Sequence, residues 1–225
     1  MDYNEQREFL DKVIIGETLD HQPVTLSLFS NSVIAIYDTD LVENDTAKII
    51  TNITDYCSNS SDCEVIMASR PIEQLSEELS NLHSEMMKER FKTLEEAGIN
   101  HIAKLPDMPF KQKIYIIKNI DISLFQEFRG IYKYIDTIKF SLSSIARLGK
   151  AAGIHVIFEI SDIHNDIYHR YIYNNILTYI ISGKVTNNKV KEDIDTYITK
   201  LPKSIITEGN VLVDKWNNTL TVFNV

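Results

Sequence analysis

The chain has 225 residues, 44% of them hydrophobic and 24% charged, which is the composition of a globular protein with a sizeable core. It carries 32 acidic and 23 basic residues and a formal net charge of −9, which argues against nucleic acid as a partner because non-specific DNA binding depends on positive charge. No apolar run approaches the ~20 residues that span a bilayer.

Residues 12–29 contain two short β-rich runs separated by "GETLDHQP", whose Gly, Asp and Pro favour a turn. Residues 32–38, "SVIAIYD", are apolar almost throughout, which is typical of a strand that is covered on both faces in a parallel sheet. A helix running to about Tyr56 follows, and three residues are candidates for its N-cap: Asn44, Asp45 and Thr46.

The next strand is predicted over 63–69. The two cysteines, Cys57 and Cys63, lie around a loop-like stretch and have no histidine at ligand spacing. They are too few for a four-ligand zinc site, and we interpret them as reduced, incidental thiols.

The segment 73–97 is the clearest predicted helix, because apolar residues recur every three or four positions and Gly98 ends the run. Phe91 falls slightly off this rhythm. Glutamates crowd the opposite side, which we interpret as a solvated face. The predicted inward positions are Leu75, Leu79, Leu82, Met86, Leu94 and Ala97.

The second half of the chain continues the alternation of strands and helices. Residues 123–135 are predicted to be helical, and Asp136 or Thr137 is predicted to cap a further helix that stops at Gly153. Its inward positions are Ile138, Leu142, Ile145 and Leu148. Apolar strands are predicted at 113–120, 154–160 and 176–182, and a terminal hairpin at 210–225, turned at "KWNN".

This order of elements predicts an α/β fold with a largely parallel sheet flanked by helices. The sequence has no internal repeat and no linker rich in Gly, Ser or Pro. We therefore expect a single domain over residues 1–225.

Two segments resemble the FtsK/SpoIIIE-type family of P-loop motor domains. In "LSNLHSEMMKERFKTLEEAGINHI", Met87, Arg90, Phe91 and Gly98 match the long helix of that family, where a Met and then an Arg with an aromatic precede a Gly. The stretch 145–158, "IARLGKAAGIHVIF", is similar to the passage into the strand before the family's sensor motif. Its matching residues are Arg147, Gly149 and Gly153.

Within this family, the chain most resembles the degenerate C-terminal ATPase-like module of type VII secretion motors of the EssC/EccC type. The resemblance implies a RecA-like P-loop NTPase fold with a C-terminal β-hairpin, in the terminal module of a longer protein anchored on the cytoplasmic side of the membrane. It also implies certain partners: secreted WXG-type helical substrates or their C-terminal signals, sibling ATPase modules of the same chain, and a hexamer of the parent protein.

A P-loop motor needs G-x-x-x-x-G-K-[ST] after its first core strand, so that backbone N–H groups and a Lys hold the phosphates and the hydroxyl holds Mg²⁺. Residues 37–48 read "YDTDLVENDTAK", without a glycine and without a lysine before Lys48. Carboxylates there would repel a triphosphate by on the order of 1 kcal/mol each. We expect the loop to place its own anion at the helix N-terminus. An ordinary acidic loop is the alternative, and both exclude tight ATP binding. The carboxylates are Asp38, Asp40, Glu43 and Asp45.

The other two nucleotide motifs also depart from the family pattern. The Walker B strand should end in Asp-Glu, for the metal and the attacking water, but Lys118 and Asn119 stand there. Asp121 would reach this position only through a register shift. After the strand ending at 158, the family's Ala-Thr-Gln-Arg-Pro is replaced by a run that includes Glu159 and Ser161. We therefore expect no catalytic residue and no cofactor in this domain, although ATP and Mg²⁺ serve the related intact modules.

The segment "DIHNDIYHR" collects residue types that bind metals, namely Asp162, His164, Asp166 and His169. Their spacing fits no metal signature, so we favour a polar loop with incidental histidines over a metal-dependent enzyme.

The sequence therefore predicts a non-hydrolysing ATPase-like domain of a type VII secretion motor, acting in substrate recognition or in the regulation of protein export. Recognition would use an amphipathic tail docked in a groove. The alternative is an active ATP-dependent translocase of protein or DNA with a non-standard nucleotide site, which predicts salt-sensitive DNA binding and nucleotide-dependent oligomerisation.

Overall fold

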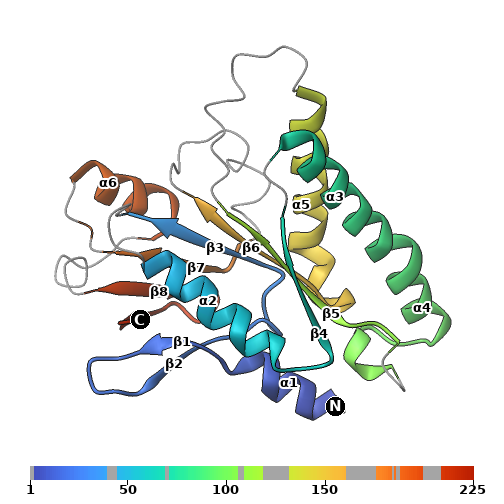
Figure 1. Cartoon of the computed structure of the whole chain (residues 1–225), viewed down its shortest axis with the longest axis horizontal. Helices are drawn as coiled ribbons and strands as arrows, with labels where there is room; N and C mark the ends of the chain where they lie inside the picture. Colours follow the sequence, from blue (N-terminus) through green and yellow to red (C-terminus); the bar gives the residue numbers. More distant parts are fainter. Residues whose placement is uncertain are drawn as a thin grey trace.

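A seven-stranded sheet forms the centre of the computed structural model, in the order β4-β5-β6-β3-β7-β8-β9 (Figure 1). The structure describes residues 3–39, 45–68, 71–105, 109–118, 132–160, 176–183, 185, 188–199 and 209–225. The strands are β3 (Val33–Asp38), β4 (Cys63–Met67), β5 (Gln112–Ile117), β6 (Ile154–Ile160), β7 (Thr178–Ser182), β8 (Asn210–Asp214) and β9 (Thr219–Phe223). Neighbouring strands pair in parallel from β4 to β7, whereas β8 and β9 are antiparallel. The predicted α/β fold with a C-terminal hairpin is confirmed.

The helices and a separate hairpin pack around this sheet. The helices are α1 (Tyr3–Asp11), α2 (Asp45–Ser58), α3 (Ile72–Glu85), α4 (Phe91–Glu96), α5 (Tyr132–Ala152) and α6 (Asn188–Tyr197). A π-helical turn, η1 (Met86–Arg90), joins α3 to α4, and a 3₁₀ turn, η2 (Ile102–Lys104), precedes β5. The antiparallel hairpin consists of β1 (Val13–Glu17) and β2 (Pro23–Leu26), as the turn signals between them predicted. No helix in the described part of the chain has the length and hydrophobicity needed to cross a membrane.

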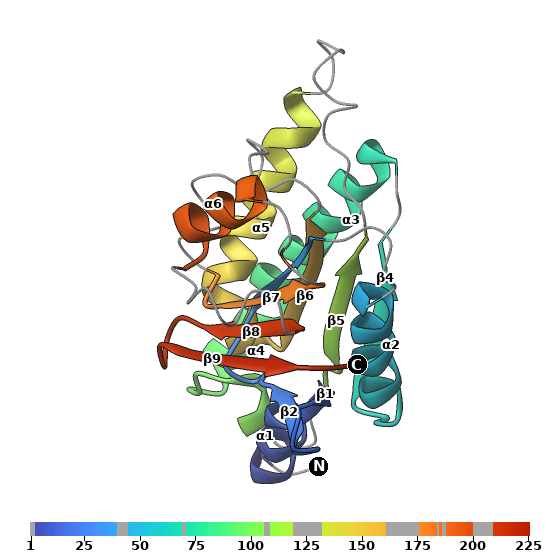
Figure 2. The ribbon, with the colours of Figure 1, turned by 90° about the vertical axis from the view of Figure 1, so that its left-hand side faces the viewer.

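The central strand β3 separates two hydrophobic cores, because successive side chains of a strand point to opposite faces. Val33, Ala35 and Tyr37 lie in the core formed with α3, α5 and α6. Ile34 and Ile36 lie in the other core, formed with α1, α2 and the β1–β2 hairpin. Figure 2 shows α2 on one side of the sheet and α5 and α6 on the other. Coverage of both faces explains why this strand is apolar throughout.

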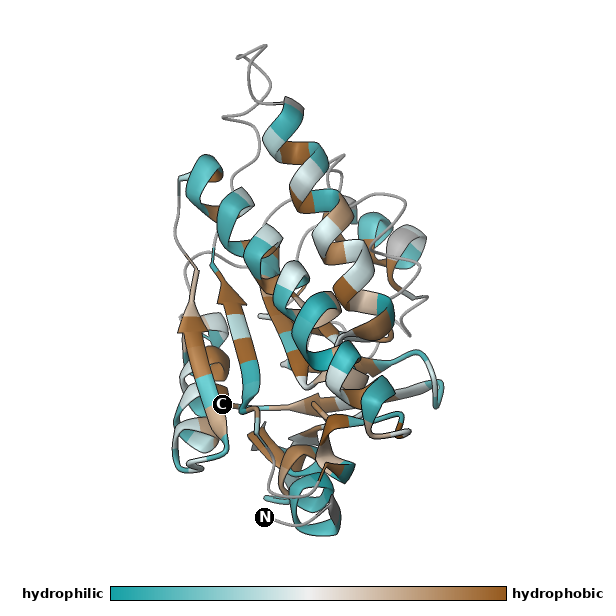
Figure 3. Ribbon diagram, turned by 90° about the vertical axis from the view of Figure 1, so that its right-hand side faces the viewer, coloured by the Kyte–Doolittle hydropathy of each residue, from teal (hydrophilic) through white to brown (hydrophobic). Residues whose placement is uncertain are grey.

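The helical segment α3–η1–α4 contains the π-turn where the apolar rhythm of the sequence slips. A π-turn adds one residue to the helix, so the buried positions continue from Met86 to Arg90 and Leu94, while Phe91 is only partly buried. Gly98, with φ of +67°, ends the segment as predicted. Ala97 lies in the terminal turn and is exposed, so its predicted inward position is wrong. Figure 3 shows the hydrophilic outer face of this segment.

Two predictions about α5 are wrong. The helix begins at Tyr132, and the Thr137 hydroxyl donates a hydrogen bond to the Lys133 carbonyl within it, so neither Asp136 nor Thr137 is an N-cap. Leu148 is 39% exposed, because the inward face continues from Ile145 to Gly149. A Cβ atom at Gly149 would lie 2.5 Å from the Ile154 carbonyl oxygen, so only glycine allows this close approach of α5 to β6.

Helices α1 and α6 were not predicted from the sequence. Leu10 of α1 is buried between the β1–β2 hairpin and α2. Ile194 of α6 is buried in the other core, and Val190 packs against that core one turn earlier. Both helices are short, and each carries few apolar residues, so little in these segments distinguishes a helix from a polar loop.

A buried polar network links the start of β3 to β5 and β6. The His155 Nδ1 atom donates a hydrogen bond to the Asn31 carbonyl (2.8 Å), and its Nε2 atom is hydrogen-bonded to Gln112 (3.1 Å). The Gln112 amide in turn donates to the Gln6 side chain of α1 (3.2 Å). Burial lowers the pKa of His155 to about 4.

This lowered pKa predicts an acid-sensitive fold. The unfolded histidine has a pKa near 6.5, so between that pH and about 4 the unfolded chain binds more protons than the folded one. The free energy of unfolding should therefore fall as the pH falls through this window, by up to about 1.4 kcal/mol per pH unit for this group. Urea denaturation across the window measures this slope. A His155→Gln variant should show a shallower slope, and an unchanged slope would contradict the assignment.

Candidate functional site

The carboxyl ends of the parallel strands meet at one edge of the sheet, where α/β proteins bind nucleotides. Asp38 ends β3 and is level with Ser182 at the end of β7. Lys118 follows Ile117, whose partner on β6 is Phe158, so Lys118 and Glu159 lie at the same level of adjacent strands. The structure thus brings Asp38, Lys118 and Glu159 to one edge. Asp40, Glu43, Asn119 and Ser161 lie outside the described residues.

Helix α2 begins at this edge with Asp45, one of the predicted anionic residues. Its carboxylate accepts hydrogen bonds from the Asn210 side-chain amide (3.1 Å) and from the Lys48 ammonium (3.3 Å). The next residue, Thr46, is buried, and its hydroxyl donates a hydrogen bond to the Ser182 hydroxyl (2.8 Å). We call Asp45, Thr46, Ser182 and Asn210 the α2 anchor.

Asn210 and Ser182 connect the anchor to the ends of three strands. Asn210 is 1% exposed, and its side-chain carbonyl accepts a hydrogen bond from the Gly183 amide (2.8 Å). The Ser182 carbonyl accepts hydrogen bonds from both the backbone amide (3.0 Å) and the hydroxyl (2.7 Å) of Thr39. The ends of β3 and β7 and the start of β8 are therefore fastened to the first turn of α2.

This arrangement has the electrostatics of an occupied anion site. The first turn of a helix carries a partial positive charge and stabilises an anion. Asp45 supplies a carboxylate there, with one oxygen facing Asn210 and the other facing Lys48. A phosphate at this helix N-terminus would meet that negative charge, and on the other side the hydroxyl of Thr46 is already used by Ser182. Glu159, one strand away from β3, is a further buried carboxyl group.

Among the family-like residues, Arg90 is the most constrained. It is 1% exposed, and its guanidinium donates hydrogen bonds to the carbonyl oxygens of Lys111 (2.9 Å), Ala152 (2.8 Å) and Gly153 (3.3 Å). Its Nε and Nη2 atoms also contact one carboxylate oxygen of Glu85, at 2.9 and 2.8 Å. A buried arginine with this many partners fixes the helical segment to the start of β5 and to the turn between α5 and β6.

Glu85 balances two cations. Burial alone would raise its pKa, but the hydrogen bond from Lys113 (2.6 Å) and the charge of Arg90 outweigh burial and lower the pKa of Glu85. Burial lowers the pKa of Arg90, and Glu85 opposes that shift. The carboxylate therefore stays ionised at neutral pH, and the cluster is structural.

The remaining family-like residues divide between packing and surface. Gly153 has φ of +66°, which glycine tolerates best, and a Cβ atom there would lie 2.7 Å from the Gln112 side chain. Arg147 and Met87 are exposed, and the Arg147 Nε atom donates a hydrogen bond to the Ser143 carbonyl (3.3 Å). Gly149 and Gly153 therefore serve close packing.

Sequence reasoning missed Ser182 and Asn210, and it considered Thr46 only as a helix cap. The available signal was slight: Ser182 is the polar end of the apolar strand β7, and Asn210 is the polar start of β8. Their pairing with α2 spans 136 and 165 residues of sequence, so no local pattern could indicate it.

Neither the two cysteines nor the candidate metal ligands form part of a site in the described residues. Cys57 and Cys63 are free and buried, and burial raises their pKa values to about 12 and about 11. The "DIHNDIYHR" segment, including His164 and His169, lies outside the described residues. Within the described ranges, no group of three or more His, Cys, Asp or Glu residues is placed to hold a metal ion.

No protein-family model and no curated protein sequence matches the chain. Solved structures do match. The conjugation coupling protein TcpA of pCW3, in monomer form with ATPγS, has a TM-score of 0.75 at 15% identity, over 95% of this chain and 66% of that chain. EssC ATPases 2 and 3 from Geobacillus thermodenitrificans have a TM-score of 0.66 at 13% identity, over 92% of this chain and 43% of that chain. The cytoplasmic domain of the type VII secretion ATPase EccC from Thermomonospora curvata has a TM-score of 0.64 at 16% identity, over 98% of this chain and 29% of that chain.

These similar structures are ATPases of the FtsK/SpoIIIE type, so the resemblance of the chain to that family is confirmed at the level of the fold. The chain spans less than two thirds of the length of each of these three structures. At 13–16% identity the likeness establishes the fold and does not by itself assign an activity.

We predict that Asp45 and Asn210 are energetically coupled. Asp45→Ala and Asn210→Ala should each lower the free energy of unfolding by about 1–2 kcal/mol, and Asn210→Ala more, because it leaves the Gly183 amide without its acceptor. In a double-mutant cycle measured by urea denaturation, the coupling energy should be about 0.5–2 kcal/mol. Lys48→Ala, which removes only the exposed partner of Asp45, is the control and should change stability by less than about 0.5 kcal/mol. Additive effects of the two main variants would contradict the coupling.

We also predict that Arg90→Met lowers the free energy of unfolding by about 3–5 kcal/mol, because it removes one of the two cations that balance Glu85 and the guanidinium that the carbonyl oxygens of Lys111 and Ala152 accept from. The free energy of unfolding of Arg90→Lys should lie between those of Arg90→Met and the wild type, because an ammonium keeps the charge but cannot reproduce the planar fork of the guanidinium. Lys88→Gln, an exposed change in the same π-turn, is the matched control. A loss below about 1 kcal/mol for Arg90→Met would show that the cluster is dispensable.

Proposed function

We propose that this chain is a degenerate, non-hydrolysing motor domain that acts in substrate recognition or in the regulation of protein export by a type VII secretion motor. In this proposal it is the terminal module of a longer membrane-anchored protein and lies on the cytoplasmic side of the membrane. The fold shared with EssC and EccC domains supports the assignment to such a motor.

The observation that carries the proposal is the position of Asp45. Its carboxylate lies in the first turn of α2, the helix that follows the central strand, where a P-loop motor would hold phosphates. Asn210 and Lys48 hold it there, so the site is supplied with an anion from the chain itself. Expelling the carboxylate in favour of a phosphate would break both contacts and place two anions together.

The neighbouring strand ends agree with a lost hydrolytic site. Lys118 stands where a motor needs a metal-binding carboxylate, and a lysine cannot bind Mg²⁺ or polarise water at neutral pH. Glu159 replaces a sensing residue and is buried within β6.

The proposed partners are secreted WXG-type helical proteins or their C-terminal signals, sibling ATPase modules of the same parent protein, and further copies in a hexamer. A solved EccC structure that contains ATPases 2 and 3 is a complex with a signal sequence peptide, at a TM-score of 0.56 and 13% identity. By analogy with that complex, we infer a peptide-recognition role for this chain.

We predict that titration of the purified chain with MgATP, followed by calorimetry, shows no saturable binding up to about 1 mM, where binding is worth only about 4 kcal/mol. Phosphate release should not exceed that of a protein-free blank. The matched titration uses an intact P-loop ATPase under the same conditions. Micromolar binding of MgATP with turnover would contradict the proposal.

A parallel titration with synthetic C-terminal segments of WXG-type proteins, with and without MgATP, should show binding that does not depend on nucleotide.

The alternative function is an active ATP-dependent translocase that uses a non-standard site. It is favoured by the similarity to TcpA, a conjugation coupling protein, and to a DNA-packaging ATPase of Sulfolobus turreted icosahedral virus, at a TM-score of 0.50. The net charge of −9 argues against a DNA partner. Salt-sensitive DNA binding together with MgATP turnover would favour this alternative.

A further inference from the structure

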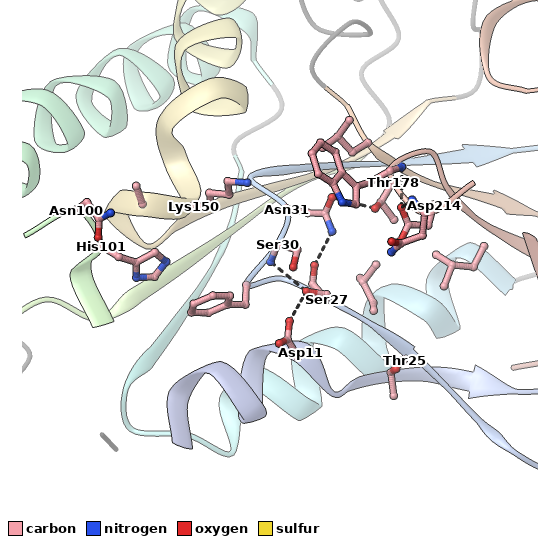
Figure 4. A pocket seen from close by; sticks show the side chains of 17 residues that line it. Asp11, Thr25, Ser27, Ser30, Asn31, Asn100, His101, Lys150, Thr178 and Asp214 are labelled. Carbon is pink, nitrogen blue, oxygen red and sulfur yellow. Dashed lines mark hydrogen bonds between the residues drawn. The ribbon is translucent and has the colours of Figure 1, made fainter. Parts of the chain in front are cut away.

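A groove lies at the edge of the sheet opposite the α2 anchor, where β3, β6 and β7 begin. It consists of two adjoining hollows of about 560 and 240 Å³. Both are lined by Ser30, Asn31, Lys150 and Leu177, so they form one continuous depression, which we call the N-edge groove. In Figure 4, Asn100 and His101 stand at one side of it and Thr178 and Asp214 at the other.

The floor of the N-edge groove is rigid. Asn31 is buried, and its side-chain amide donates a hydrogen bond to the Ser27 carbonyl (2.7 Å) while its side-chain carbonyl accepts one from the Thr178 hydroxyl (2.9 Å). The backbone carbonyl of Asn31 accepts from His155. A preformed floor lowers the ordering cost of binding a ligand.

The two acidic side chains in the groove are already satisfied. One Asp214 oxygen accepts hydrogen bonds from the backbone amides of Trp216 (2.9 Å) and Asn217 (3.1 Å), and the other from the Asn217 side chain (2.7 Å). Asp11 accepts a hydrogen bond from the Ser27 hydroxyl and pairs with Arg7 (3.5 Å). Both carboxylates therefore serve the local fold, and neither is available to a ligand cation.

The basic side chains of the groove lack such partners. Lys150 and Arg147 are exposed on the last two turns of α5, and within the described ranges no carboxylate lies within 4.0 Å of either. Burial, then the charge of Lys104 and then the charge of Lys150 lower the pKa of His101, which lines the larger hollow together with Lys150. The groove therefore offers a positive potential within an acidic protein.

The end of α5 does not cancel this potential. The last carbonyl oxygens of a helix carry a partial negative charge that would repel an anion. In α5, the carbonyl oxygens of Ala152 and Gly153, at and just beyond its last residue, accept hydrogen bonds from the buried Arg90 guanidinium. Arg90 therefore neutralises the helix terminus from inside, and the charges of Lys150 and Arg147 remain available outside.

An apolar surface lies beside these cations. Trp216, the single tryptophan of the chain, lines the larger hollow and is 79% exposed in the turn between β8 and β9. Leu177, Leu212 and Phe29 line the same hollow. An exposed tryptophan at the rim of a hollow is the kind of side chain that dominates binding energy when a partner covers it.

We propose that the N-edge groove binds an extended peptide segment in which carboxylates flank a large apolar side chain. The carboxylates pair with Lys150 and Arg147, and the apolar side chain packs between Trp216 and the leucines of the larger hollow. This inference rests on the proposed recognition function and gives it a location and a chemical class of ligand.

Nucleic acid fits the groove less well. A phosphate backbone needs several cations in a row, whereas here two cations, which have no carboxylate partner in the part of the chain that the structure describes, stand beside the carboxylates of Asp11 and Asp214. The chain as a whole carries −9, which repels a polyanion at long range. A short acidic peptide presents few charges and gains from the apolar surface.

The test is a selection of random dodecapeptides displayed on phage against the purified chain, with subtraction against the Lys150→Glu, Arg147→Glu double variant. Two enriched peptides that contain no tryptophan are then synthesised and titrated while the fluorescence of Trp216 is recorded. We expect the enriched peptides to be acidic with at least one Leu, Phe or Trp, and to shift the emission of Trp216. Affinity should fall about tenfold or more in the double variant and in Lys150→Ala, Arg147→Ala, and should fall with salt.

Lys88→Glu changes the net charge by the same amount as the Lys150→Ala, Arg147→Ala variant, on an exposed residue that does not line the groove, and it should bind like wild type. Circular dichroism checks that each variant is folded. Enrichment of basic or purely apolar peptides, equal affinity for the folded double variant, or preferential binding of a single-stranded oligonucleotide would overturn the proposal. This titration contains no WXG-type segment. If the selected peptides fail to bind, the groove proposal is wrong, but the proposed function is still tested separately by the titrations with MgATP and WXG-type segments. Conversely, WXG-type segments that bind the double variant normally would support that function and exclude this groove.

Discussion

The buried guanidinium of Arg90 is the contact on which the arrangement of this fold depends. It joins the π-turn after α3 to the residue before β5 and to the turn between α5 and β6, so three elements distant in sequence share one cation. A charge in such a place is tolerable only because Glu85 and the carbonyl oxygens satisfy its donors. By fixing where β5 and β6 begin, Arg90 also fixes the level at which Lys118 and Glu159 reach the opposite edge.

The two edges of the sheet differ in whether their charged side chains have partners within the fold. At the carboxyl edge, Asp45 is held inside the fold by Asn210, and the polar groups of Thr46 and Ser182 satisfy each other. At the opposite edge the acids are held by their own turns, while Lys150 and Arg147 are left without acidic partners among the described residues. In our proposals, the edge that binds nucleotide in a motor is closed by the protein itself, and the capacity to bind a ligand has moved to the other edge.

Much of the fold could be predicted from the sequence because its signals are local. Apolar runs marked the buried strands, and glycines marked the ends of the helices, as at Gly98 and Gly153. What failed needed information from elsewhere in the chain. The π-turn exists to carry Arg90 to carbonyl oxygens up to 63 residues away. Asp136 looked like a cap because nothing local shows that the helix already begins at Tyr132. The α2 anchor depends on Ser182 and Asn210, which carry no pattern of their own.

The family-like stretch 145–158 can be explained without any nucleotide. Gly149 allows α5 to approach the Ile154 carbonyl, and Gly153 takes a left-handed conformation and offers its carbonyl to Arg90. Each of these needs is imposed by the packing of α5 on β6, whether or not the edge of the sheet carries out chemistry. The packing of α5 on β6 therefore accounts for the glycine spacing of this stretch whatever the nucleotide motifs are, because the two are under separate physical constraints. For the same reason, a likeness in this stretch is evidence for the fold, and the chemistry has to be argued from Asp45, Lys118 and Glu159.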